Sequence, residues 1–185
     1  MTTVHHPSNF NLPNLLSILR ILMIPLALWG MIKEEYLFSF TLLIMAGITD
    51  ALDGFLARKL GQFTPMGRVL DPLADKVLFV SVFITMGFWL ELFPDWFSWM
   101  IVGRDLLILG GFFTLILSHK NRSIEPTLSG KIHTILLFVF LCVVLLSLSY
   151  GVSIPLNLLM YGMALSTLLS LGGYFRVWLR RMSGE

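Results

Sequence analysis

Long apolar stretches, separated by short charged segments, dominate this chain. A helix needs roughly 20 residues to cross the hydrocarbon core of a bilayer. Stretches of about this length occur along the whole chain and predict membrane-spanning helices over 12–32, 36–58, 67–91, 97–118, 130–150 and 155–175. The predicted fold class is therefore an all-α integral membrane protein with six transmembrane helices.

The charges between these stretches predict how the helices are oriented. One set of connections, together with the C-terminal segment, is basic and contains Arg58, Lys59, Lys120, Arg122, Arg176, Arg180 and Arg181. The opposite set is acidic on balance or uncharged, with Lys33 beside Glu34 and Glu35 in the first connection, Glu91 and Asp95 in the second, and the uncharged YGVSIP in the third. Because basic residues favour the cytoplasmic side, we expect both termini in the cytoplasm.

Composition supports a membrane setting and one domain. The chain is 56% hydrophobic and 13% charged, with a mean hydropathy of +0.83, which is too apolar for a soluble globule. Cys142 is the only cysteine, so the sequence allows neither an intrachain disulfide nor a thiolate metal cluster. With no repeat, linker or targeting peptide evident, we expect a single membrane domain over 1–185, an interfacial segment at 1–11, and a bacterial inner membrane as its location.

Four aspartates lie among these apolar residues: Asp50, Asp53, Asp71 and Asp75. Ionised carboxylates at membrane depth are costly unless opposite charges compensate them. The members of each pair are three or four residues apart, so each pair projects from one face of its helix. Both pairs reach about 12 Å inward from the cytoplasmic helix ends, so the two faces are expected to meet.

Such a carboxylate cluster predicts bound divalent cations. Like charges in a low-dielectric cleft oppose one another's ionisation, and cations relieve that repulsion. Oxygen ligands favour Mg²⁺ or Mn²⁺ over zinc, and a two-metal site suits displacement at phosphorus. Gly54 and Gly67 allow a ligand to approach the backbone, while Arg58 can hydrogen-bond a phosphate. A nucleotide diphosphate is the predicted ligand class.

The stretch from Asp50 to Asp75 resembles, at every fixed position, the signature of the CDP-alcohol phosphotransferase family. The segments NLPNLLSILRILMIPL, LDPLADK, Arg104-Asp105 and GKIHT are similar to its phosphatidylglycerophosphate synthase and cardiolipin synthase branch. The resemblance implies a six-helix, commonly dimeric enzyme without a nucleic-acid partner. It also implies a cytoplasm-facing cavity and an Mg²⁺- or Mn²⁺-dependent transfer of phosphatidyl from CDP-diacylglycerol to an alcohol, releasing CMP.

The same resemblance implies roles for individual residues. Asp50, Asp53, Asp71 and Asp75 would hold two divalent cations, and Asp75 would also be the general base. The CDP site would be shaped by Gly54, Ala57, Arg58 and Gly67, flanked by Thr64 and Arg68. From its depth in the fourth span, rather than from the resemblance, we expect Arg104 to bind the acceptor, with Lys131 as a further candidate.

The acceptor itself is left open by these residues. Phosphatidylglycerophosphate synthases usually carry a Glu after the fourth-span arginine, an arginine eight residues beyond it, and a Gly-Lys-x-Lys-Thr segment. This chain has Asp105, Phe112 and His133 at those places. Family frequency favours glycerol 3-phosphate, whereas the loss of cations favours the lipid acceptor phosphatidylglycerol, as in cardiolipin synthases. Inositol phosphate and serine are further alternatives.

Structural alternatives exist for several of these residues. The aspartates could serve only to form buried ion pairs with Arg20, Lys76 and Arg104. Arg58 and Arg68 could simply extend their charged ends to the interface. Arg104 itself lies too deep in the fourth span for this, so an ion pair or an anionic substrate must hold it.

A different class of function is also compatible with intramembrane carboxylates. The carboxylates alone would permit a divalent-cation carrier or a lipid-binding scaffold, but cation transport does not require glycine and arginine at fixed offsets. The four histidines, His5, His6, His119 and His133, are not spaced as a metal site, and we expect them at the surface or the membrane interface.

Overall fold

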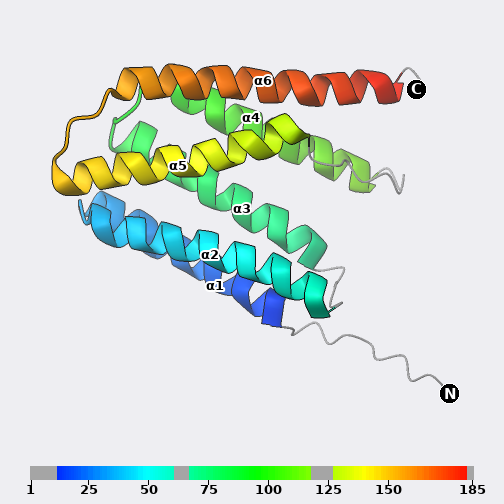
Figure 1. Cartoon of the computed structure of the whole chain (residues 1–185), viewed down its shortest axis with the longest axis horizontal. Helices are drawn as coiled ribbons and strands as arrows, with labels where there is room; N and C mark the ends of the chain where they lie inside the picture. The colour runs from blue at the N-terminus through cyan, green and yellow to red at the C-terminus, as the bar shows by residue number, and fades with distance from the viewer. Residues whose placement is uncertain (1–11, 61–66, 118–126, 183–185) are drawn as a thin grey trace. The chain divides into compact units, whose positions relative to one another are not determined.

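The computed structural model describes residues 12–60, 67–117 and 127–182, and these residues form helices joined by short connections (Figure 1). The elements are α1 (Leu12–Ile32), α2 (Tyr36–Leu60), α3 (Gly67–Ile84), the π-helix η1 (Thr85–Trp89), α4 (Asp95–Leu117), α5 (Leu128–Tyr150) and α6 (Leu156–Met182). No strand occurs within these ranges. The helices begin within about two residues of the predicted positions, which confirms the all-helical prediction.

The third predicted span, 67–91, is not α-helical throughout. Its α-helix ends at Ile84 and continues as a π-helical turn, in which the Leu90 N–H donates to the Thr85 carbonyl at 2.9 Å. Gly87 lies in this turn, directly against Ser98 of α4, and a Cβ there would collide with the Ser98 side chain. The wider turn therefore brings a backbone without a side chain against α4.

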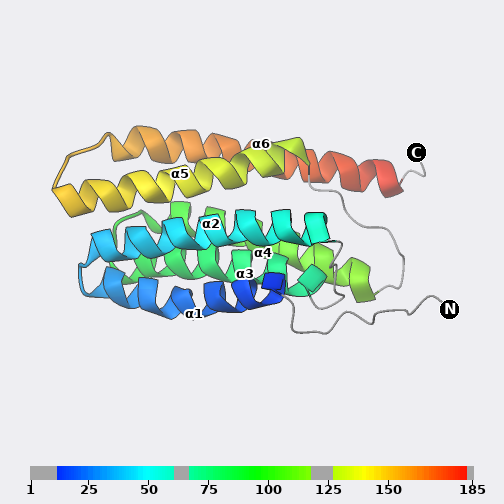
Figure 2. The same ribbon diagram turned by 60° about the horizontal axis from the view of Figure 1, so that its bottom comes forward.

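The chain divides into two compact units, residues 1–82 and 83–185, so that the boundary falls near the end of α3. In the first unit α1 and α2 run antiparallel, side by side (Figure 2). Their shared core contains Met23, Ala27 and Met31 of α1 and Leu43 of α2. The buried Ser39 hydroxyl donates to the Ala27 carbonyl at 2.8 Å, which links the two helices.

The turn between α1 and α2 has an unusual residue at its centre. Glu34 has a φ of 62°, in the left-handed region that favours glycine. The Glu35 N–H donates to the Gly30 carbonyl at 2.8 Å, and the Glu34 N–H donates to the Met31 carbonyl at 3.1 Å. These two bonds form the Schellman motif that commonly ends a helix, here with glutamate where glycine is usual.

In the second unit α5 and α6 are antiparallel neighbours, and α4 packs against α6 and η1. An aromatic cluster of Phe83, Phe93, Phe97 and Phe140 fills its core, with ring centroids 5.5–6.3 Å apart. Thr127 caps the start of α5 by accepting a hydrogen bond from the Gly130 N–H at 3.1 Å. The polar residues described below belong to the helices that pack around this aromatic core.

The outer surfaces of the helices are apolar. Two of the described helices, Leu128–Tyr150 and Leu156–Val177, are long and apolar enough to cross a membrane, and shorter apolar helical stretches lie at Ile18–Ile32, Tyr36–Leu52 and Lys76–Trp89. On α6, Leu158, Leu165 and Leu169 are exposed. An exterior of this kind suits hydrocarbon, in agreement with a membrane protein.

Candidate active site

The first motif aspartate lies in an ion pair between α1 and α2. The Arg20 Nη1 atom is 2.7 Å from the Asp50 carboxylate, and the Arg20 side chain is 1% exposed whereas that of Asp50 is 44% exposed. The apolar stretch around Arg20 therefore carries one buried cation, which directs its charge toward the aspartate motif. If the aspartates had only a structural role, Asp50 would be expected to pair with Arg20, and this contact is that pair. The carboxylate of Asp50 is nevertheless partly exposed and accessible to a further ligand.

The rest of the motif is placed by the backbone alone. Asp53, Gly54, Ala57 and Arg58 belong to α2, and Gly67, Arg68, Asp71 and Asp75 belong to α3, but their side chains lie outside the described part of the structure. Thr64 lies outside the described residues altogether. The end of α2 and the start of α3 lie at the same end of the first unit (Figures 1 and 2). Residues 61–66 connect the two helix ends, which therefore lie at most about 25 Å apart.

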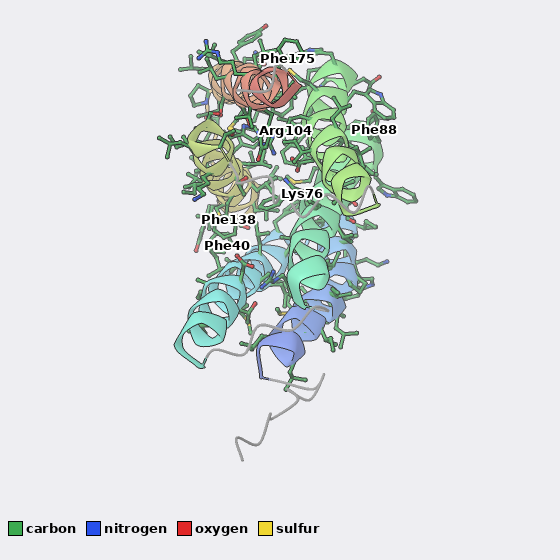
Figure 3. The ribbon with its side chains drawn as sticks, turned by 90° about the vertical axis from the view of Figure 1, so that its right-hand side faces the viewer. Phe40, Lys76, Phe88, Arg104, Phe138 and Phe175 are labelled. Carbon is green, nitrogen blue, oxygen red and sulfur yellow. The ribbon has the colours of Figure 1, made fainter. Side chains whose placement is uncertain are left out.

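A second polar cluster surrounds Arg104 in the other unit. The Arg104 Nη1 atom donates to the Asp105 carboxylate at 2.5 Å, and Nη2 donates to the Ser170 hydroxyl of α6 at 2.7 Å. The guanidinium carbon also lies 5.9 Å from the centre of the ring of Tyr174, which belongs to α6 like Ser170. Figure 3 shows Arg104 extending from α4 into the space beside α6. Arg104, Asp105 and Ser170 are all buried.

The Arg104 guanidinium retains hydrogen-bonding capacity. Its Nε–H is buried without a hydrogen-bond partner in the described part of the chain. A guanidinium has five N–H groups, and the two bonds above use one from each terminal nitrogen. Because a buried donor without a partner costs free energy, this arrangement suits an oxyanion that accepts from the remaining N–H groups.

The two other polar residues of this region lie on different faces of α5. Lys131 is exposed, and no contact among the described residues brings it to Arg104. His133 is 0% exposed, and its Nδ1 atom is 3.0 Å from the Ser166 hydroxyl of α6. The expectation of a surface or interfacial His133 was therefore wrong. His133 shares the inward face of α5 with Leu137 and Leu141, at a helical spacing of four, and this spacing was the signal for its burial.

Comparison with known proteins decides the family. The sequence model of the CDP-alcohol phosphatidyltransferase family matches residues 10–171. This chain belongs to that family. It is 42% identical over 127 residues to the CDP-diacylglycerol--glycerol-3-phosphate 3-phosphatidyltransferase of Aquifex aeolicus, covering 68% of this chain and 70% of the relative.

The chain is also similar to two longer relatives with different names. The chain is 35% identical, over an alignment of 185 positions, to the chloroplastic CDP-diacylglycerol--glycerol-3-phosphate 3-phosphatidyltransferase 1 of rice, covering 89% of this chain and 56% of the relative. It is 28% identical to the CMP-forming cardiolipin synthase of Rattus norvegicus, covering 94% of this chain and 63% of the relative. The chain thus spans less than two thirds of these two relatives.

Membership gives the class of chemistry. Members of the CDP-alcohol phosphatidyltransferase family use CDP-diacylglycerol and an alcohol acceptor, and the apolar helices agree with a membrane-associated biosynthetic enzyme. Four contributors to the polar clusters were not predicted as site residues: Arg20, Asp105, Ser170 and Tyr174. Arg20 was considered only as a structural ion-pair partner of the aspartates, and serine and tyrosine in α6 carry no signal without knowledge of how α6 faces α4.

Proposed function

We propose that this protein transfers phosphatidyl from CDP-diacylglycerol to glycerol 3-phosphate, giving phosphatidylglycerophosphate and CMP. The observation that carries a phosphate-bearing acceptor is the buried Arg104 guanidinium, whose Nε–H is without a partner in the described part of the chain. An acceptor that bears a phosphate supplies oxygens for such donors. Among such acceptors, the relatives named as glycerol-3-phosphate phosphatidyltransferases favour glycerol 3-phosphate.

In the proposed reaction Asp75 acts as the general base. Its carboxylate takes the proton from the acceptor hydroxyl, and the hydroxyl oxygen forms a bond to the phosphorus that carries the diacylglycerol. The bond from this phosphorus to the bridging oxygen of the diphosphate breaks, and CMP leaves with the electron pair. Gly54, Ala57, Arg58 and Gly67, with Thr64 and Arg68 beside them, would bind and orient the CDP group, and Lys131 would join Arg104 at the acceptor.

The aspartates would hold two Mg²⁺ or Mn²⁺ ions. The donor set fits these ions because it consists of carboxylates, and because the open side of Asp50 leaves ligand positions beyond its ion pair with Arg20. Asp50, Asp53, Asp71 and Asp75 are the residues that would bind them. When bound, the cations supply positive charge that stabilises the diphosphate and the departing CMP.

We also propose the cellular setting. Six membrane spans with both termini in the cytoplasm follow from the distribution of basic residues, and they would place the active site on the cytoplasmic side of a bacterial inner membrane. The active form would be a homodimer, as is common among proteins with this signature.

Cardiolipin synthesis is the second candidate, because the similarity to the rat cardiolipin synthase extends over 94% of this chain. The two candidates differ only in the acceptor.

Purified protein would be incubated with CDP-diacylglycerol and Mg²⁺, with glycerol 3-phosphate or phosphatidylglycerol offered separately, and CMP and lipid products would be measured. We expect CMP release with glycerol 3-phosphate alone. Release with phosphatidylglycerol alone would favour the cardiolipin synthase, and no release with any alcohol would favour a non-enzymatic cation- or lipid-binding protein.

A further inference from the structure

The Arg104 side chain is held by three groups that approach from different directions. Asp105, on the same helix, accepts from one terminal nitrogen, and Ser170 of α6 accepts from the other at 2.7 Å. The ring of Tyr174, one helical turn beyond Ser170, faces the guanidinium at 5.9 Å. Two hydrogen bonds fix the terminal nitrogens and the guanidinium carbon lies over the Tyr174 ring, so the Nε–H has a defined direction.

This direction matters because the Asp105 carboxylate lies against the guanidinium and offsets its charge at short range. An incoming phosphate must then be recognised by correctly directed N–H groups. Arginine recognises oxyanions through such a planar, directional set of donors.

The second contact of Tyr174 connects this cluster to α5. A Cβ atom placed on Gly130 would lie 2.9 Å from both Cε2 and the hydroxyl oxygen of Tyr174, so the ring occupies the space that this glycine leaves. Gly130 is buried at the start of α5, where Thr127 caps the helix. The position of the Tyr174 ring, over which the Arg104 guanidinium lies, is therefore set from α5 as well as α6.

We propose that Ser170 and Tyr174 are positioning residues for the acceptor: they hold the Arg104 guanidinium so that its Nε–H and second terminal N–H groups meet the acceptor phosphate. This inference deepens the proposed function and rests on it. The recognised chemistry is a phosphate oxygen, which glycerol 3-phosphate carries on a monoester and phosphatidylglycerol on a diester. Ser170 and Tyr174 themselves need not touch the acceptor.

The test compares Ser170→Ala with a matched control on the same helix. Thr167→Val is the control, because Thr167 is equally buried but its hydroxyl donates to the Met163 carbonyl of its own helix. Loss of a hydrogen bond to a charged group raises a dissociation constant roughly tenfold. We expect Ser170→Ala to raise KM for the acceptor by roughly this factor, with kcat and KM for CDP-diacylglycerol within about twofold of the wild type.

Tyr174 and Ser170 each have a conservative variant that separates positioning from packing. Tyr174→Phe keeps the ring and should leave KM for the acceptor unchanged, whereas Tyr174→Leu removes the ring and should raise it by roughly three- to tenfold. Ser170→Thr keeps the hydroxyl and should restore the value lost in Ser170→Ala. Equal KM increases for both substrates, or the same increase in Thr167→Val, would overturn the inference by indicating a general loss of packing.

A binding measurement keeps this test separate from the test of the proposed function. A ligand that binds only the folded protein raises the midpoint of thermal unfolding, Tm, so titration with glycerol 3-phosphate or phosphatidylglycerol reports acceptor binding without turnover. We expect the better acceptor to raise Tm of the wild type and to lose this effect in Ser170→Ala but not in Thr167→Val. Equal shifts in Ser170→Ala and the wild type, or no shift in the wild type with either compound, would overturn the inference. Absence of CMP release, with the binding pattern intact, would instead count against the proposed reaction alone.

Discussion

Arg20 and Asp50 form an ion pair of 2.7 Å across α1 and α2, in which the arginine is buried and the aspartate is partly open. The asymmetry gives the two residues different tasks. The buried cation supplies the charge partner that a carboxylate in an apolar setting needs, and the open side of the carboxylate can bind a further ligand. The pair is therefore compatible both with a structural role and with a ligand site built around Asp50.

Substitution of Arg20 and Asp50, singly and together, should show that their contributions to the free energy of unfolding are coupled. In a double-mutant cycle of Arg20→Met and Asp50→Asn, we expect a coupling free energy of about 1–2 kcal/mol, between the values for exposed and buried ion pairs. Thermal or denaturant unfolding of the two single variants, the double variant and the wild type in detergent would measure it. Additive effects of the two substitutions would show that the contact contributes nothing to stability.

Gly87 should be intolerant of even a methyl group. A Cβ atom there would overlap the Ser98 side chain, so we expect Gly87→Ala to lower the free energy of unfolding by about 1–3 kcal/mol. Gly162→Ala is the matched control, because a Cβ at Gly162 meets nothing within 4 Å and alanine favours a helix. Thermal unfolding of both variants makes the comparison, and equal stability would show that η1 and α4 can separate without cost.

The helices themselves could be predicted from the sequence because membrane-spanning segments need long apolar stretches. The first helix was predicted at 12–32 and is Leu12–Ile32, whereas the third ends its regular α-helical part at Ile84 instead of near residue 91. Apolarity continues through Thr85–Trp89, so hydropathy carries no sign of the π-helical turn. The turn coincides with the close contact of Gly87 with Ser98, which depends on how α4 packs.

The candidate site was predictable only in part, for a similar reason. Arg104 could be singled out because a cation within an apolar span needs a partner, but the identity of that partner depends on the rotation of α6. Sequence spacing places Ser166, Ser170 and Tyr174 on one face of α6, yet does not say which helix this face meets. The structure supplies that information by bringing Ser170 to Arg104 and Ser166 to His133.

Glu34 offers a stabilising substitution. Its φ of 62° is unfavourable for a residue with a side chain, and glycine adopts it without strain. We expect Glu34→Gly to raise the free energy of unfolding by about 0.5–1 kcal/mol, measured by thermal unfolding. The neighbouring Glu35→Gly is the control and should not stabilise, because Glu35 does not have a positive φ. A loss of stability in Glu34→Gly would contradict the strain argument.

The two proposed roles of the aspartates should separate kinetically. Loss of a general base lowers kcat by about 10²- to 10⁴-fold, so Asp75→Asn should do so in a protein that still unfolds cooperatively. Asp50→Ala should also increase the Mg²⁺ or Mn²⁺ concentration needed for half-maximal rate. Metal titrations of both variants, after removal of cations by chelation, would make the distinction. Full turnover in a well-folded Asp75→Asn protein would show that Asp75 is not the general base.

The most direct measurement follows a labelled acceptor into the lipid phase. Purified protein with CDP-diacylglycerol, Mg²⁺ and radiolabelled glycerol 3-phosphate should move label from water into chloroform-extractable lipid, with one CMP released for each labelled lipid formed. This one-to-one ratio is what phosphatidyl transfer to glycerol 3-phosphate requires. CMP release without labelled lipid, or labelled lipid without CMP, would contradict the account.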